Sequence, residues 1–176
     1  MRRFSPAERE LVHRAMHEAE ERTARYYCFP PHRWQDLRFD LLTRRDHEWQ
    51  PLPPPVLARL QRLVKLGAIP GRSYDFYRIQ LNDRAILDVF HRRDFGAELY
   101  PFLVYILTHE MVHLVRLSSI LEEETPAAES PAAEEERVDR ISRQILCSAP
   151  RMEIDPIISK FTLRINRDAH LFFTQR

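Results

Sequence analysis

Two histidines lie four residues apart in the segment YILTHEMVHLVR, residues 105 to 116, and a glutamate directly follows the first of them. Four residues are about one helical turn, so on a helix His109 and His113 project side by side and can offer two imidazole nitrogens to one metal ion. From the next position, the Glu110 carboxylate can reach a water activated by that metal and act as its general base. The spacing therefore predicts a site for metal-assisted hydrolysis.

The residues around this motif predict a buried helix from roughly residue 97 to residue 121. Apolar side chains surround the motif almost completely, which favours a central helix over one at the surface. Buried imidazoles and a buried carboxylate need polar partners. A metal ion would satisfy all three groups, whereas the alternative requires two core histidines hydrogen-bonded elsewhere and one separately paired glutamate. The apolar neighbours are Phe102, Val104, Ile106, Leu107, Met111, Val112 and Leu114.

A second group with helical spacing occurs near the amino terminus. In HRAMHEAEE, His13, His17 and Glu21 also follow one another at intervals of four. They fall opposite the apolar side of the first expected helix, where charged side chains are solvated. We therefore expect these three side chains to be exposed and not to form a metal site.

The motif supplies only two ligands, whereas a catalytic zinc ion usually takes three and keeps a fourth position for water. The third could be an acid on the following helix, Cys147, or His170 near the end of the chain. The following helix is expected from about residue 133 to residue 149, because EERVDRISRQILCSA spaces its apolar residues on one stripe before a proline. That stripe consists of Val138, Ile141, Ile145 and Leu146.

These two segments together resemble the zincin superfamily of metallopeptidases, and more narrowly its glutamate-liganded branch, the gluzincins. In that branch HExxH is followed on a later helix by ExxxD, and EERVD supplies this spacing with Glu135 and Asp139. The resemblance implies that Glu135 is the third ligand of one Zn²⁺ per chain, that Asp139 supports a ligand histidine, and that Glu110 is the general base of an endopeptidase. Apolar periodicity favours Glu134 instead as the inward residue, so the choice between the two glutamates stays open.

The resemblance covers the two helices and, more loosely, the strand expected before them, which is less than half of the chain. Many small intracellular members have glycine before the second histidine and alanine before the aspartate, where this chain has Val112 and Val138. The resemblance therefore implies the chemistry of the site and not a particular substrate.

The elements that must position the motif predict an α+β fold. We expect a single, mainly helical zincin-like domain over residues 1–176, with a small sheet packed on the HExxH helix. A long first helix begins at Pro6, because Ser5 and Glu8 have the spacing of a capping box. A second helix is expected from about Pro55 to Leu66, and Asp83 is expected to cap a short helix.

Two segments are expected to be strands. LRFDLLTRR, residues 37–45, favours a first strand, and YDFYRIQLN, residues 74–82, alternates as a half-buried strand does. Zincins usually carry a sheet whose edge strand binds an extended peptide, so the resemblance implies this role for YRIQLN, residues 77–82. An ordinary sheet strand would show the same pattern.

The segment LEEETPAAESPAAEEE, residues 121–136, contains no large apolar side chain after Leu121. Its like charges repel one another, so we expect a flexible acidic surface loop over about residues 122–133, which acts as a solvated connector or binds another protein.

Hydrolysis of a peptide bond also needs a donor for the developing oxyanion. The sequence offers several candidates without ranking them: Tyr77, Tyr100, Tyr105, Arg164 and His170.

Composition limits the choice of partners. The net charge is +1, from 27 basic and 26 acidic residues, so nothing general points to nucleic acid or to a membrane surface. The strongest apolar run, LYPFLVYIL at 99–107, is about half of the ~20 residues that span a bilayer. Cys28 and Cys147 are single and widely separated, as reduced thiols are, and the amino-terminal segment does not resemble a secretory signal. A cytoplasmic location is therefore expected.

Three functions follow from these observations. The first is a cytoplasmic zinc-dependent peptidase that acts on a peptide or protein. The second is a non-catalytic zincin-like module that keeps a structural metal or regulates a partner. The third is a protease recruited to DNA through the arginines of residues 62–78, which the near-neutral charge disfavours. The natural substrate and the oligomeric state are left open.

Overall fold

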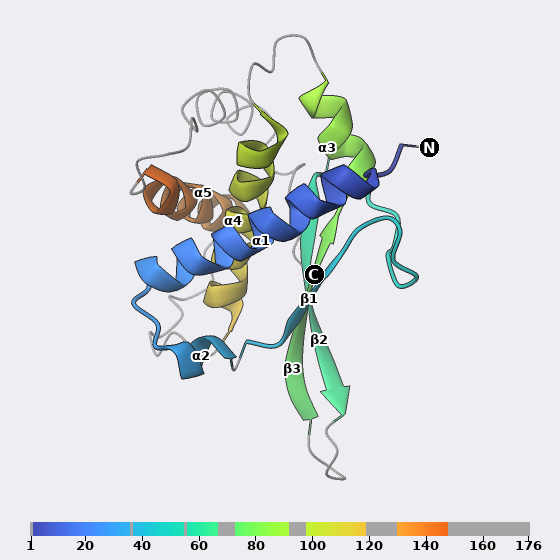
Figure 1. The fold of residues 1–176 in the computed structure, drawn as a ribbon. Helices are drawn as coiled ribbons and strands as arrows, with labels where there is room; N and C mark the ends of the chain where they lie inside the picture. Colours follow the sequence, from blue (N-terminus) through green and yellow to red (C-terminus); the bar gives the residue numbers. More distant parts are fainter. Residues whose placement is uncertain are drawn as a thin grey trace.

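The computed structural model describes residues 2–35, 37–54, 56–66, 73–91, 98–118 and 130–147. Within these residues the fold is α+β, as expected, with helices packed around one another and against a small sheet (Figure 1). The helices are α1 (Pro6–Tyr26), α2 (Pro31–Gln35), α3 (Asp83–Phe90), α4 (Leu99–Leu117) and α5 (Pro131–Cys147). The strands are β1 (Phe39–Leu42), β2 (Ala58–Leu66) and β3 (Ser73–Leu81).

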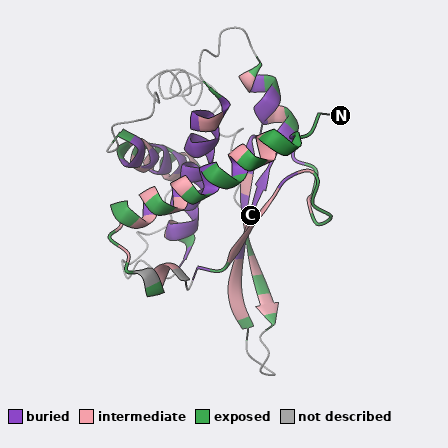
Figure 2. Cartoon of the chain, in the orientation of Figure 1, coloured by how far each residue is buried: buried purple, intermediate pink, exposed green. Residues whose placement is uncertain are grey.

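Helix α4 lies at the centre of the fold and carries the HExxH motif. It contacts α1, α5 and β2, and every residue from Pro101 to Val115 is buried (Figure 2). Apolar side chains occur on almost every side of this helix, and neighbouring elements of the fold cover each side. The prediction of a buried central helix is confirmed, and its consequence is that three ionisable side chains lie in the core.

Helix α1 covers one side of α4 and begins where the sequence predicted. The Ser5 hydroxyl accepts a hydrogen bond from the Glu8 amide at 3.2 Å, and the Glu8 carboxylate accepts one from the Ser5 amide at 2.7 Å. This capping box satisfies two amides that the first turn would otherwise leave unpaired. The buried side of α1, which packs toward α4, consists of Val12, Ala15, Met16, Ala19 and Thr23.

The prediction of a helix from Pro55 to Leu66 is wrong, because residues Ala58–Leu66 form strand β2. Its first half alternates in burial, with Ala58 and Leu60 buried and Arg59 and Gln61 partly exposed. The apolar residues of this segment fit a helical and an extended spacing about equally. Antiparallel pairing with β3 along the whole strand decides between them, since it satisfies the backbone groups of both strands.

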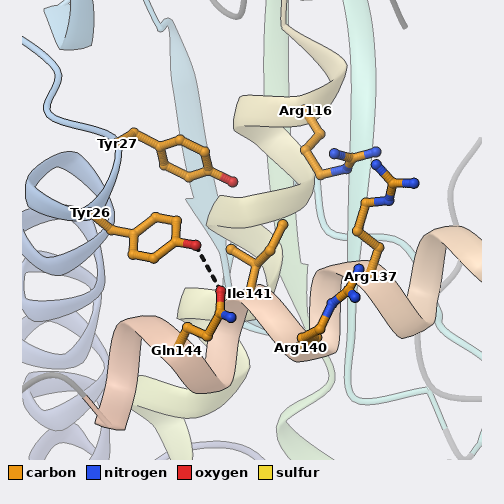
Figure 3. Close-up of a pocket in the computed structure, with 7 residues that line it drawn as sticks. All are labelled: Tyr26, Tyr27, Arg116, Arg137, Arg140, Ile141 and Gln144. Carbon is orange, nitrogen blue, oxygen red and sulfur yellow. Dashed lines mark hydrogen bonds between the residues drawn. The ribbon is translucent and has the colours of Figure 1, made fainter. Parts of the chain in front are cut away.

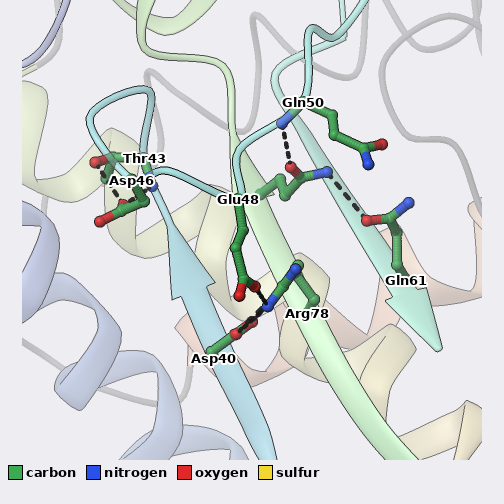
Figure 4. Close-up of polar contacts among 8 residues, drawn as sticks. Asp40, Thr43, Asp46, Glu48, Gln50, Gln61 and Arg78 are labelled. Carbon is green, nitrogen blue, oxygen red and sulfur yellow. Dashed lines mark hydrogen bonds and ion pairs between the residues drawn. The ribbon is translucent and has the colours of Figure 1, made fainter. Parts of the chain in front are cut away.

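The resemblance implied that β3 could be a peptide-binding edge strand, with an ordinary sheet strand as the alternative, and the structure contradicts the edge position. The strand order is β1-β3-β2, so β3 is central, parallel to β1 and antiparallel to β2. The expected alternation is confirmed, because Tyr77, Ile79 and Leu81 are buried. Gln80 is buried on the other face, where its side chain accepts from the Gln50 amide at 2.8 Å and donates to Gln61 at 3.1 Å (Figure 4).

Two of the three arginines of residues 62–78, Arg62 and Arg78, have carboxylate partners, and Arg72 lies outside the described residues. Arg78 pairs with Asp40 at 2.8 Å and also with Glu48 (Figure 4). Arg62 pairs with Asp75 across β2 and β3 at 2.7 Å. These contacts neutralise the charges of Arg62 and Arg78, so these two side chains are less able to bind the phosphate groups of DNA.

Helix α3 begins one residue away from the expected cap. Asn82, rather than Asp83, is the N-cap, and its side chain accepts a hydrogen bond from the Ala85 amide at 3.3 Å. Asp83 is buried and accepts the backbone amides of Phe4 and Arg44, each at 3.0 Å. Its carboxylate therefore fastens two distant segments to the start of α3, a role that no local pattern indicates.

Helix α5 begins earlier in the chain than expected, and Pro131 stands at its first position, which proline favours. The end of the loop expected at 122–133 is therefore helical, while residues 122–129 lie outside the described residues. A search of the described helices for a stretch long and apolar enough to cross a membrane finds none.

Candidate metal centre

The two histidines of the motif meet Glu135 between α4 and α5. The Nε2 atoms of His109 and His113 lie 3.1 Å apart. Glu135 faces both rings, with one carboxylate oxygen 3.3 Å from the His109 Nε2 and the other 3.3 Å from the His113 Nε2. Both imidazoles are about 1% exposed and the glutamate 9%, so the cluster lies in the core. Three groups that commonly bind metal ions therefore converge from two helices.

The spacing of these atoms fits a tetrahedral zinc site. Zinc bonds to nitrogen and oxygen ligands are about 2.0–2.1 Å long, which separates neighbouring ligands of a tetrahedron by about 3.3 Å. The three observed separations are 3.1, 3.3 and 3.3 Å. A cation at bonding distance from all three groups would need little movement of the side chains, so the residues fit the ion.

Hydrogen bonds within the cluster would satisfy the two imidazoles and the Glu135 carboxylate less well than a metal ion would. Each Nε2 atom has two polar neighbours in the cluster, one on the other histidine and one on Glu135. An imidazole nitrogen has only one position for a hydrogen bond, as donor or as acceptor. The Nε2 atoms of His109 and His113 cannot serve both neighbours at once, whereas one cation would bind all three groups.

The structure distinguishes the two glutamates that the sequence left open. Glu134 turns away from the histidines and forms a bidentate ion pair with Arg116, with both distances 2.7 Å. Glu135 is the buried one of the two and faces the imidazoles. Of the other candidates for third ligand, Cys147 is exposed and stands twelve residues after Glu135, about 18 Å along α5. His170 lies outside the described residues.

The environment favours the protonation states that a metal requires. Burial alone would raise the pKa of Glu135, but contacts with the two imidazoles outweigh it and lower this pKa to about 2. Burial lowers the pKa of His109 below its ordinary value, against the opposing effect of the Glu135 carboxylate. An ionised carboxylate beside a neutral imidazole is the form in which both groups bind zinc.

Glu110 lies beside this cluster without an obvious structural role. It is 1% exposed, and its Oε1 atom has no hydrogen-bond partner among the residues that the structure describes. Burial raises the pKa of Glu110 well above its ordinary value, and the negative charge of Glu135 adds to this effect. A buried carboxyl oxygen without a hydrogen-bond partner is costly, so its presence calls for a functional explanation.

Asp139 joins α5 to the helix that carries the motif. It accepts a hydrogen bond from the Tyr105 hydroxyl at 2.8 Å and pairs with Arg143 on its own helix. Its charge also acts on His109, where it favours the protonated ring. Sequence reasoning did not find the bond to Tyr105. Tyr105 and His109 lie four residues apart on α4, and Glu135 and Asp139 lie four residues apart on α5. Because each pair shares one face of its helix, this spacing is the sequence signal that could have predicted the contact between Tyr105 and Asp139.

The candidate oxyanion donors among the described residues have other contacts. The Tyr77 hydroxyl donates to the Leu117 carbonyl at 3.3 Å, and the Arg14 guanidinium lies 5.1 Å from the centre of the Tyr100 ring. Tyr105 lies near the cluster, with its ring centroid 6.5 Å from that of His109, but its hydroxyl donates to Asp139. Arg164 and His170 lie outside the described residues.

The second histidine group behaves as expected. His13, His17 and Glu21 are all exposed on the outer side of α1. Glu21 forms an ion pair with Arg25 at 3.2 Å. Among the described residues, the His109, His113 and Glu135 cluster is the one group of at least three potential ligands arranged to hold a metal ion. The same spacing of four residues thus gives exposed side chains on α1 and a buried cluster on α4, because different sides of the two helices are buried.

Comparison of the chain with protein-family models, with curated proteins and with solved structures finds no match. The assignment of a function therefore depends on the motif and on the geometry of the cluster.

Proposed function

We propose that this protein is a zinc-dependent metallopeptidase of the gluzincin type, in which His109, His113 and Glu135 hold one Zn²⁺ per chain. The observation that carries the proposal is the convergence of two imidazole nitrogens and a carboxylate, at separations of 3.1–3.3 Å, in a buried position. Two helices separated in sequence supply these groups. The HExxH and ExxxD spacings provide independent support from the sequence.

The roles of the surrounding residues follow from their positions. Zinc bound by these ligands supplies Lewis-acid activation of a water molecule and of the substrate carbonyl. Glu110 is the general base: it takes a proton from that water on its carboxylate and gives it to the leaving amine. Its unsatisfied Oε1 atom supports this role. Asp139, held by Tyr105 and Arg143, positions α5 and thereby Glu135 against the histidines.

The substrate class in this proposal is a peptide or an unfolded protein, because HExxH sites overwhelmingly hydrolyse peptide bonds in the families that the motif resembles. A cytoplasmic location belongs to the same proposal. The free, exposed state of Cys28 and Cys147 supports it, since thiols stay reduced in that compartment.

A second candidate function is a non-catalytic zincin-like module that binds the metal for structural purposes. The burial of His109, Glu110 and His113, each about 1% exposed, favours it, because structural zinc sites are closed whereas catalytic sites keep an open position. The two candidates differ in whether a small molecule can reach the metal.

The decisive experiment combines metal analysis with hydrolysis. We expect purified protein to contain close to one zinc per chain, and the Glu135→Ala variant to lose it. Glu110→Gln should keep the metal and lose hydrolysis of an unfolded protein substrate. With cobalt in place of zinc, the absorption spectrum should change when a small hydroxamate is added, because a catalytic site has a free coordination position. A metal-loaded protein that neither responds to hydroxamate nor cleaves any polypeptide would support the structural module instead.

A further inference from the structure

A separate cavity of about 370 Å³ lies where the end of α1, the end of α4 and one side of α5 meet (Figure 3). This volume is within the range of sites for small molecules, about 300–1,000 Å³. Among the residues that the structure describes, the lining contains three arginines and no acidic side chain. The residues that line it are Tyr26, Tyr27, Arg116, Arg137, Arg140, Ile141 and Gln144.

The cavity is distinct from the metal centre, although both involve α5. Four of its residues follow the i, i+3, i+4, i+7 spacing of a single helical stripe. At about 100° per residue, this stripe lies roughly 120–180° around α5 from Glu135. The opposite side of α5 buries Glu135, Val138 and Asp139 against the core. The cavity is therefore open to molecules that never reach the histidines.

Positive charge is concentrated in this cavity. The guanidinium groups of Arg116 and Arg137 extend toward the same region, from α4 and α5 respectively (Figure 3). Glu134 balances the charge of Arg116 through its bidentate pair. Arg140 is exposed and forms no ion pair with any residue that the structure describes. An oxyanion in this cavity could pair with the Arg140 guanidinium and add further N–H donors from its arginine neighbours.

The rest of the lining is aromatic or apolar. Tyr26 and Tyr27 meet edge to face, with ring centroids 5.1 Å apart, and Ile141 lies across from them (Figure 3). The Tyr26 hydroxyl donates to the Gln144 side chain at 2.8 Å, which links α1 to α5 at one end of the cavity. Arginines on one side and rings on the other would suit a ligand that has both a charged and an apolar part.

We propose that this cavity binds an oxyanion, phosphate or carboxylate, attached to a small aromatic or aliphatic group. The arginine side chains bind the oxyanion through paired N–H donors, and the tyrosine rings and Ile141 pack on the apolar part. This site takes a different class of ligand from the metal centre and does not depend on the proposed peptidase activity.

The test uses the full chain and three probes: phenyl phosphate, inorganic phosphate and phenol. Binding is followed by two-dimensional amide NMR, which also maps the responding residues. We expect phenyl phosphate to bind most tightly and phenol least, with shifts confined to residues around Tyr26, Arg137 and Gln144. Raising the salt concentration should weaken binding of phenyl phosphate, because the contact is electrostatic.

Variants test whether phenyl phosphate binds at this cavity or binds to surface charge in general. The double variant Arg137→Gln and Arg140→Gln should lower the affinity for phenyl phosphate at least about tenfold, since charged hydrogen bonds are lost. Arg84→Gln, which removes an exposed arginine of α3, is the matched control and should change nothing. Circular dichroism and thermal melting check that each variant folds. Equal binding of phenol and phenyl phosphate, unchanged affinity in the double variant, or no binding of phenyl phosphate to the unaltered chain would each overturn the proposal.

Discussion

Replacing Glu110 with glutamine should make the metal-free protein more stable while it abolishes hydrolysis. The carboxyl group is 1% exposed, its Oε1 atom has no hydrogen-bond partner among the described residues, and the Glu135 carboxylate acts on it unfavourably. Glutamine has nearly the same shape and cannot ionise, so it avoids the cost of burying a charge close to the Glu135 carboxylate. A residue kept for catalysis at the expense of stability behaves in this way.

The size of the effect follows from the contacts. A buried polar group without a partner costs about 1–3 kcal/mol, and in a chain of this length each kcal/mol changes the melting temperature by about 2–4 °C. The metal-free Glu110→Gln protein should therefore melt about 2–12 °C higher than the unaltered protein. Loss of the general base should lower the hydrolysis rate about 10²–10⁴-fold.

The assay is differential scanning calorimetry of both proteins after treatment with a chelator, with zinc content and hydrolysis measured on untreated samples. Glu10→Gln is the control, because Glu10 is exposed on α1, and its melting temperature should change by less than about 2 °C. A Glu110→Gln variant that melts at or below the temperature of the unaltered protein would show that Glu110 is well accommodated in the core. Retained hydrolysis would refute its role as the base.

Three further results are expected. Glu135→Ala should weaken zinc binding by more than about 100-fold, since even residues that only support a ligand contribute about 10–100-fold, whereas Glu134→Ala should leave zinc affinity in a competition titration nearly unchanged. Tyr105→Phe removes a donor from the buried Asp139 carboxylate and should lower the free energy of unfolding in urea by about 1–3 kcal/mol; a loss below about 0.5 kcal/mol would contradict the observed bond. Zinc added at about 100 times its dissociation constant should raise the free energy of unfolding by about 2.7 kcal/mol, and a chelator should reverse this gain.

Much of the fold could be predicted from the sequence wherever the signal was local. The Ser5 and Glu8 capping box fixed the start of α1, because the atoms that form it lie within one turn. The apolar character of residues 99–115 on all sides predicted that α4 would be central. The exposure of His13 and His17 followed from their place on the helix opposite the buried residues of α1.

The errors arose where partners distant in sequence decide the structure. Residues Ala58–Leu66 have apolar side chains that suit a helix or a strand, and only pairing with β3 selects the strand. The position of β3 within the sheet depends on the parallel approach of β1, which no pattern inside YRIQLN can reveal. Asp83 likewise bonds to Phe4 and Arg44, residues that lie far from it in the chain.

The sequence by itself determined that His109, Glu110 and His113 share one turn of a buried helix, because helical spacing and apolar neighbours are local properties. It also limited the candidates for a third metal ligand to a few residues. The tertiary structure alone decided that Glu135 meets the imidazoles while Glu134 pairs with Arg116. The two glutamates are adjacent in the chain, and their roles depend on how α5 is rotated against α4, which the packing of Val138 and Ile145 on Val112 sets.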